Sequence, residues 1–165
     1  MKYDLDAVGF STLSIYPTKH GFSFAYFENP EILSDWGNVS ARGAAVPAKI
    51  AGLMDRFSPE VVVTNQCDGE NARTSERARS TIRSVIEISE RRVVQINHLN
   101  RKDILSVFSI FAATRKIDVA RVIAIWFPEL ANILPPPSKV WMDESRQMGI
   151  FDAVALAIAH YRLGN

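Results

Sequence analysis

Asp152 is the first residue in this sequence whose setting suggests chemistry. It is the only polar side chain between Met148 and Ala159, where every other residue is apolar or glycine. A buried carboxylate without a partner costs several kcal/mol, so Asp152 requires one. Two kinds of partner satisfy this need: a backbone amide or an arginine, which would make the residue structural, or a metal ion, which would make it a ligand.

Basic residues are the second candidate group. Four arginines lie within eleven residues of the chain: Arg73, Arg77, Arg79 and Arg83. The net charge of the whole chain, +1, does not reveal this cluster. Residues four apart share a helix face, so this cluster is one candidate for binding phosphates. The alternative is a solvated helix face whose arginines pair with Glu76, Glu87 and Glu90.

Other chemistry finds little support. The three histidines show no metal-ligand spacing, Ser11 and Ser14 have no visible base partner, and there is no glycine-rich phosphate loop. The single Cys67 excludes an internal disulfide and a cysteine metal cage, which favours the cytoplasm. No segment approaches the roughly 20 apolar residues of a membrane-spanning helix, and no signal peptide is visible, so we expect no membrane association.

The elements that must position these residues indicate an α/β domain. The length of 165 residues and the apolar content of 47% predict one globular domain over 1–165. Apolar and β-branched runs predict strands at Leu13–Tyr16, Phe22–Glu28, Ile32–Val39, Val61–Thr64 and Arg92–Ile96. Helical spacing predicts helices at Pro47–Phe57, Ser75–Arg91, Arg101–Phe111, Ile117–Phe127 and from near Asp143 to Tyr161. This order predicts a mixed sheet, antiparallel in its first three strands and parallel afterwards, with helices on both faces.

Three segments, in this order, resemble the RuvC-like nucleases, Holliday-junction-resolving endonucleases of the RNase H-like superfamily. In that family the first strand ends in Asp-Pro-Gly or Asp-Pro-Ser, and this chain has Tyr16-Pro17-Thr18. The fourth strand ends in Glu, and here the run 59–64 leads to Asn65. The last helix carries Asp-Ala-x-Ala-Leu-Ala, and residues 152–157 match it. The resemblance implies an RNase H-like fold, branched DNA as partner and a homodimer.

The resemblance also implies which positions would bind metal. Tyr16 stands where the first-strand Asp would be, and Asn65 stands where the fourth-strand Glu would be. Gly149 occupies a position that is often acidic, and only Asp152 is retained. Tyr16 is expected to fill the space that metals would occupy, and Asn65 to cap the loop after its strand.

Two further acids, Asp143 and Glu144, lie near the start of the last predicted helix. Cleavage in this family uses two Mg²⁺ or Mn²⁺ ions, which together carry four positive charges. In this chain at most three nearby carboxylates would balance those charges. We therefore expect impaired or absent nuclease activity, with a weak metal site at Asp152 at best. A shifted alignment would recruit Asp35, Asp68 or Glu70 instead, although none of these lies at a strand end.

Lys116 matches a basic position that contacts the DNA backbone in the family, and the region of the four arginines borders the DNA groove there. Three hypotheses follow. The chain is a RuvC-like binder of branched DNA with a degenerate site, an active Mg²⁺-dependent structure-selective endodeoxyribonuclease using Asp152, Glu144 and Asp143, or a dimeric interaction module without DNA binding.

Overall fold

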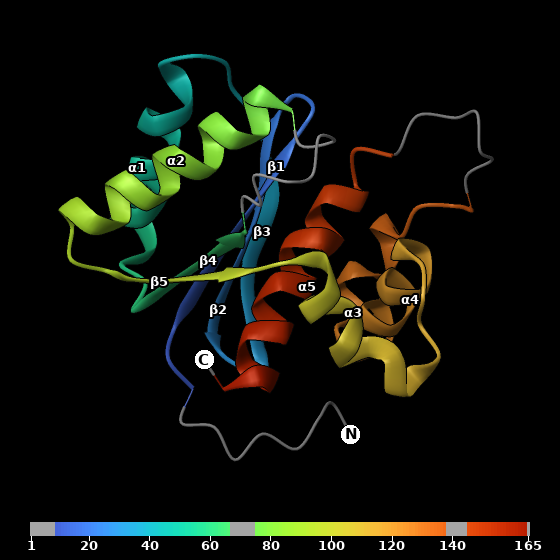
Figure 1. The fold of residues 1–165 in the computed structure, drawn as a ribbon. Helices are drawn as coiled ribbons and strands as arrows, with labels where there is room; N and C mark the ends of the chain where they lie inside the picture. The colour runs from blue at the N-terminus through green and yellow to red at the C-terminus, as the bar shows by residue number, and fades with distance from the viewer. Residues whose placement is uncertain (1–8, 67–74, 138–144, 165) are drawn as a thin grey trace.

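The computed structural model describes residues 9–66, 75–137 and 145–164, and Figure 1 shows how their elements are arranged. The strands are β1 Thr12–Thr18, β2 Gly21–Asn29, β3 Ile32–Ser40, β4 Val61–Asn65 and β5 Gln95–Leu99. The helices are α1 Ala45–Phe57, α2 Glu76–Arg91, α3 Arg101–Phe108, α4 Lys116–Trp126 and α5 Met148–Leu163, with short 3-10 turns at Ser109–Phe111 and Pro128–Ile133.

The five strands form one sheet in the order β3-β2-β1-β4-β5. β1 pairs antiparallel with β2, and β2 pairs antiparallel with β3. β4 then runs parallel to β1, and β5 runs parallel to β4. The predicted mixed sheet, antiparallel first and parallel afterwards, is confirmed.

The central strand β1 has a core on each of its faces. Leu13 and Ile15 belong to a cluster with apolar residues of α1 and α2. Ser14 lies on the opposite face, where its hydroxyl donates a hydrogen bond of 2.6 Å to the backbone oxygen of Ala153 in α5. Because successive side chains of a strand point to opposite faces, α1 and α2 cover one side of the sheet while α3, α4 and α5 cover the other (Figure 1). Helices on both faces are thus confirmed.

Helix α5 lies directly against the sheet and is buried along almost its whole length. Gly149, Ala153 and Ala157 recur every four residues, so they form one narrow stripe of the helix. Small residues along such a stripe let the helix backbone approach β1 and β2 closely. Its apolar character therefore reflects burial, and among the described residues no helix is long and apolar enough to span a membrane.

Two predicted boundaries are wrong. The fifth strand was predicted at Arg92–Ile96 but runs over Gln95–Leu99, because Arg92 caps α2 and Val93 turns the chain with a φ of 55° and 91% exposure. The last helix begins at Met148 rather than near Asp143, since residues 145–147 form a turn before it. Asp143 itself lies outside the described residues.

Candidate functional site

Tyr16, Asn65 and Asp152, the three residues that the alignment singled out, meet at one edge of the sheet. The parallel register pairs Ile15 with Thr64, so Tyr16 and Asn65 follow as neighbours at the carboxyl ends of β1 and β4. Asp152 comes from the N-terminal part of α5. All three line two adjoining hollows of about 530 and 640 Å³. In open α/β sheets, ligands bind at this edge.

Lys116, the first residue of α4, also lines both hollows. The start of its helix is fixed by Asp118, which accepts hydrogen bonds from the backbone and the guanidinium of Arg115 at 3.1 and 3.2 Å. The hydrogen bond from the Arg115 side chain lowers the pKa of the Asp118 carboxyl, so this cap stays ionised. The capped helix start holds the backbone of Lys116 in place.

The Lys116 ammonium is the partner that Asp152 requires. Its Nζ lies 3.1 Å from Oδ2 of Asp152 and 3.5 Å from the hydroxyl oxygen of Tyr16. It also lies 5.4 Å from the centroid of the Tyr16 ring, within the range of a cation–π interaction. The Asp152 side chain is 13% exposed and the Lys116 side chain 32%. The structural interpretation of Asp152 expected an arginine or a backbone amide as its partner, and the structure places the ammonium of a lysine beside it.

Asn65 lines both hollows. Its amide oxygen Oδ1 is buried and accepts no hydrogen bond within the described part of the chain. The cap predicted for the following loop is not seen as far as Gln66, and residues 67–74 lie outside the described residues.

Gly149 cannot carry a side chain in this arrangement. A Cβ atom on Gly149 would overlap Oγ of Ser23 in β2 and would lie 2.9 Å from Cγ2 of Thr18 in β1. The residue that the resemblance places at a frequently acidic position is therefore a glycine because α5 lies against the sheet at this point.

The donor set of this site does not fit a pair of divalent metal ions. Asp152, its one carboxylate among the described residues, already contacts an ammonium, while Asn65 and Tyr16 supply only an amide and a phenol. Magnesium prefers anionic oxygen ligands, and a lysine beside the carboxylate adds positive charge where the ion would sit. Within residues 9–66, 75–137 and 145–164, no group of three or more His, Cys, Asp or Glu side chains could hold a metal. The other predicted acids, Asp143 and Glu144, lie outside these ranges.

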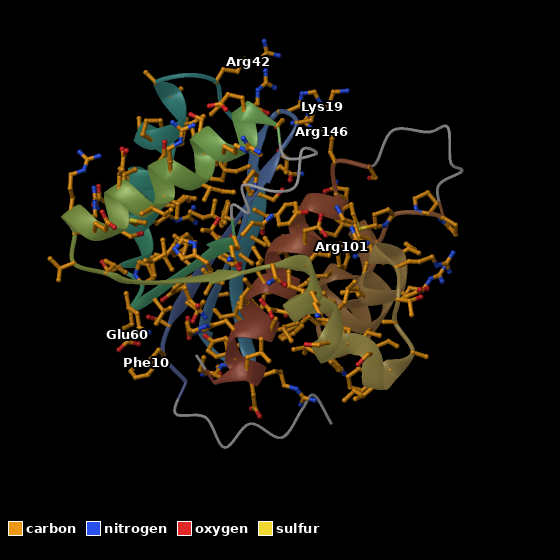
Figure 2. All side chains as sticks on the ribbon, viewed as in Figure 1. Phe10, Lys19, Arg42, Glu60, Arg101 and Arg146 are labelled. Carbon is orange, nitrogen blue, oxygen red and sulfur yellow. The ribbon has the colours of Figure 1, made fainter. Side chains whose placement is uncertain are left out.

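A third hollow of about 440 Å³ shares His20 and Arg146 with the first and extends the site to one side. We call the three hollows together the basic groove. Its lysines and arginines come from turns and helix starts across the chain: Lys19, Arg42, Arg101, Lys102, Lys116 and Arg146. Asp152 is the only carboxylate among the described residues that line it. Figure 2 shows Lys19, Arg42 and Arg146 at one end, with Arg101 apart from them.

The predicted arginines on α2 do not line the basic groove. Arg77 donates a hydrogen bond to the backbone oxygen of Lys19, so it supports the β1–β2 turn from outside. Arg83 forms an exposed ion pair of 2.7 Å with Glu76, as the solvated-face interpretation anticipates. Arg79 is half-buried, and its Nε has no hydrogen-bond partner among the described residues. Arg73 lies outside the described residues.

Most of the groove's positive charge comes from residues that no sequence pattern singled out. Lys19 follows β1, Arg101 and Lys102 follow β5, and Arg146 precedes α5. These residues are far apart in sequence, so no local cluster marks them. Their common signal is position, since each adjoins an element end that the topology brings to the same edge of the sheet.

Solved structures of other proteins share this arrangement of strands and helices. Thermus thermophilus RuvC superposes with a TM-score of 0.65 at 14% identity, covering 93% of this chain and 96% of that one. The same protein in complex with a Holliday junction substrate gives 0.68 at 15% identity, covering 94% and 96%. The yeast mitochondrial Holliday junction resolvase Ydc2 gives 0.59 at 14% identity, covering 92% and 77%.

The fold is RuvC-like. At these identities the likeness establishes the architecture, which agrees with the resemblance seen in the sequence. No protein-family model matches the chain, and no curated protein matches its sequence. In this RuvC-like chain the site at the carboxyl edge of β1 and β4 contains a lysine–aspartate pair.

Proposed function

We propose that this protein binds nucleic acid through the basic groove, with branched DNA as its partner, and that its nuclease activity is impaired or absent. One observation carries the proposal: among the described residues, six lysines and arginines line the groove against one carboxylate, and Lys116 pairs with that carboxylate. The whole chain has a net charge of only +1, so positive charge is concentrated here. Such clustering on one face is the electrostatic feature of nucleic-acid binders.

The RuvC-like fold supports branched DNA as the partner. Thermus thermophilus RuvC, whose fold this chain shares, was solved with a Holliday junction substrate. The basic groove lies on both sides of Lys116, with Arg101 and Lys102 in one direction and Lys19 and Arg146 in the other. Positive charge on both sides of one point suits a backbone that passes through it. Arg73, Arg77, Arg79 and Arg83 are proposed as further phosphate contacts.

Impaired cleavage is proposed from the chemistry of the site. Two divalent ions need several anionic ligands, and the described residues offer one carboxylate already in contact with an ammonium. The homodimer, the single domain over 1–165 and the cytoplasmic location remain predictions from the sequence.

The test compares a labelled four-way DNA junction with a linear duplex of the same arm sequence, in a titration followed by fluorescence anisotropy. We expect tighter binding to the junction and an affinity that falls steeply with salt, with a logarithmic slope of about −0.9 for each phosphate neutralised. Incubation with Mg²⁺ or Mn²⁺ should leave the junction uncut. Efficient cleavage would select the active endonuclease that uses Asp152, Glu144 and Asp143, whereas the absence of salt-dependent binding would select the interaction module.

A further inference from the structure

The Lys116 ammonium lies beside Asp152, the one acidic residue among the described residues that line the site. Asp152 and Tyr16 hold it from two sides, at 3.1 and 3.5 Å. We propose that this ammonium replaces the divalent cations of a RuvC-like site. It receives one phosphodiester oxygen of the bound DNA without metal, and Asp152 is its positioning residue. This inference rests on the proposed nucleic-acid binding and names how the same site holds its ligand.

Charge balance favours a single ammonium over metal. The carboxylate of Asp152 carries one negative charge, and Lys116 neutralises it. The other donors at this point, the amide of Asn65 and the phenol of Tyr16, add no negative charge at neutral pH. A divalent ion placed here would face one carboxylate of the described residues and the repulsion of the nearby ammonium, whereas the single charge of the ammonium is balanced by that carboxylate.

The accessibility of the pair sets the direction in which a phosphate can approach. Both side chains line the two large hollows, but the Lys116 side chain is 32% exposed and the Asp152 side chain only 13%. A phosphodiester in the groove therefore meets the ammonium first. Carboxylate, ammonium and phosphate then alternate in sign, and the surrounding lysines and arginines attract the phosphate from both sides.

Positioning by Asp152 and Tyr16 matters because lysine is flexible. A free lysine side chain loses rotamer entropy when a ligand orders it. The ion pair with Asp152 and the contact with the Tyr16 ring restrict the ammonium before DNA arrives. A pre-ordered donor binds its ligand at a lower entropic cost.

The experiment is a chemical double-mutant cycle on the full chain, in buffer containing EDTA. Neutral methylphosphonates replace single phosphates, one at a time, around the branch point of the four-way junction. We expect Lys116→Gln to bind the unmodified junction about tenfold more weakly than wild type does, because it loses one charge-assisted contact. A methylphosphonate at one position should weaken junction binding by the wild-type protein by a similar factor. The same methylphosphonate should weaken junction binding by Lys116→Gln less than twofold. The matched control is Lys49→Gln on the exposed surface of α1, which should keep the full methylphosphonate effect.

Two further variants separate binding from folding. Lys116→Met with Asp152→Asn removes both charges together, which a partly buried ion pair tolerates better than the loss of one partner. This double variant should unfold cooperatively as wild type does and lack the methylphosphonate response. Asp152→Asn alone should keep a reduced response, because it removes the positioning group and not the donor.

The outcomes distinguish the two proposals. Failure of wild type to bind any junction in a salt-dependent manner would overturn the proposed function and this inference with it. If the junction binds but the effects of Lys116→Gln and of every methylphosphonate on the binding free energy are additive, only the inference is overturned. Wild-type binding that requires divalent metal, or Mn²⁺ bound at one or two equivalents to the wild-type complex by electron paramagnetic resonance, would also overturn only the inference.

Discussion

Gly149 in α5 and Ser23 in β2 lie so close together that no side chain fits on the glycine. A Cβ atom placed on Gly149 would overlap Oγ of Ser23 and would lie 3.3 Å from the Cβ atom of Ser23. Ser23 is itself fixed by a hydrogen bond of 2.5 Å from its hydroxyl to Oδ1 of Asn38 in β3. The helix, the hairpin and the absence of an acid at position 149 therefore depend on one another.

Gly149→Ala should destabilise the protein by about 2 kcal/mol, because an overpacked core must shift its neighbours. The measurement is urea unfolding followed by circular dichroism, with the midpoint compared at constant slope. The matched control is Gly52→Ala in α1, where a Cβ meets nothing within 4 Å. That change should stabilise the helix by up to about 1 kcal/mol. Equal stability of wild type and Gly149→Ala would show that α5 is free to move away from the sheet.

The pH dependence of stability should carry a contribution from His160. This imidazole is buried in α5, and its Nδ1 lies 2.9 Å from the amide nitrogen of Asn97. Burial lowers its pKa, so the unfolded chain takes up the proton more readily than the folded chain. The free energy of unfolding should therefore fall as the pH drops below about 6.5, the ordinary value for histidine.

The measurement for His160 is a comparison of wild type with His160→Gln between pH 5 and pH 7.5. The difference in unfolding free energy between the two proteins should shrink steadily as the pH falls, because only wild type loses this contribution. A difference that stays constant over this range would contradict the assignment.

Arg101→Gln should reduce the salt dependence of junction binding. Arg101 starts α3 and lines the groove, so its loss should make the logarithmic salt slope about one unit shallower. Lys49→Gln, outside the groove, serves as the control. Measuring Arg83→Gln beside them tests the arginine cluster predicted from the sequence. A larger change for Arg83→Gln than for Arg101→Gln would place the main phosphate contacts on α2.

Much of the fold follows from sequence patterns because those patterns reflect burial. The run Val61-Val62-Val63 is buried on both faces of the sheet, which is why it lacks alternation. The misplaced fifth strand shows the limit of such reasoning. Val93 and Val94 are β-branched, yet Val93 lies in a turn with positive φ, which no propensity scale anticipates.

The site was only partly predictable for a related reason. Tyr16, Asn65 and Asp152 were identified because each belongs to a recognisable local motif. The contact between Lys116 and Asp152 joins positions 36 residues apart, and only the packing of α4 beside α5 brings them together. Lys116 was expected to contact phosphate, and in the structure its ammonium contacts the carboxylate of Asp152. The phosphate contact stays a prediction.

The same contact changes what a designed metal site requires. Tyr16→Asp with Asn65→Glu would supply two carboxylates at the ends of β1 and β4, but both would face the Lys116 ammonium. We expect this double variant to bind Mn²⁺ weakly and the triple variant that adds Lys116→Met to bind it at least about tenfold more tightly, because the competing cation is gone.

Isothermal titration with Mn²⁺ measures this difference, and the single variant Lys116→Met serves as the control because it leaves Asp152 as the only carboxylate among the described residues of the site. Equal affinities for the double and triple variants would show that Lys116 does not occupy the cation position. No Mn²⁺ binding by the triple variant would instead contradict the alignment that places Tyr16 and Asn65 at metal-ligand positions.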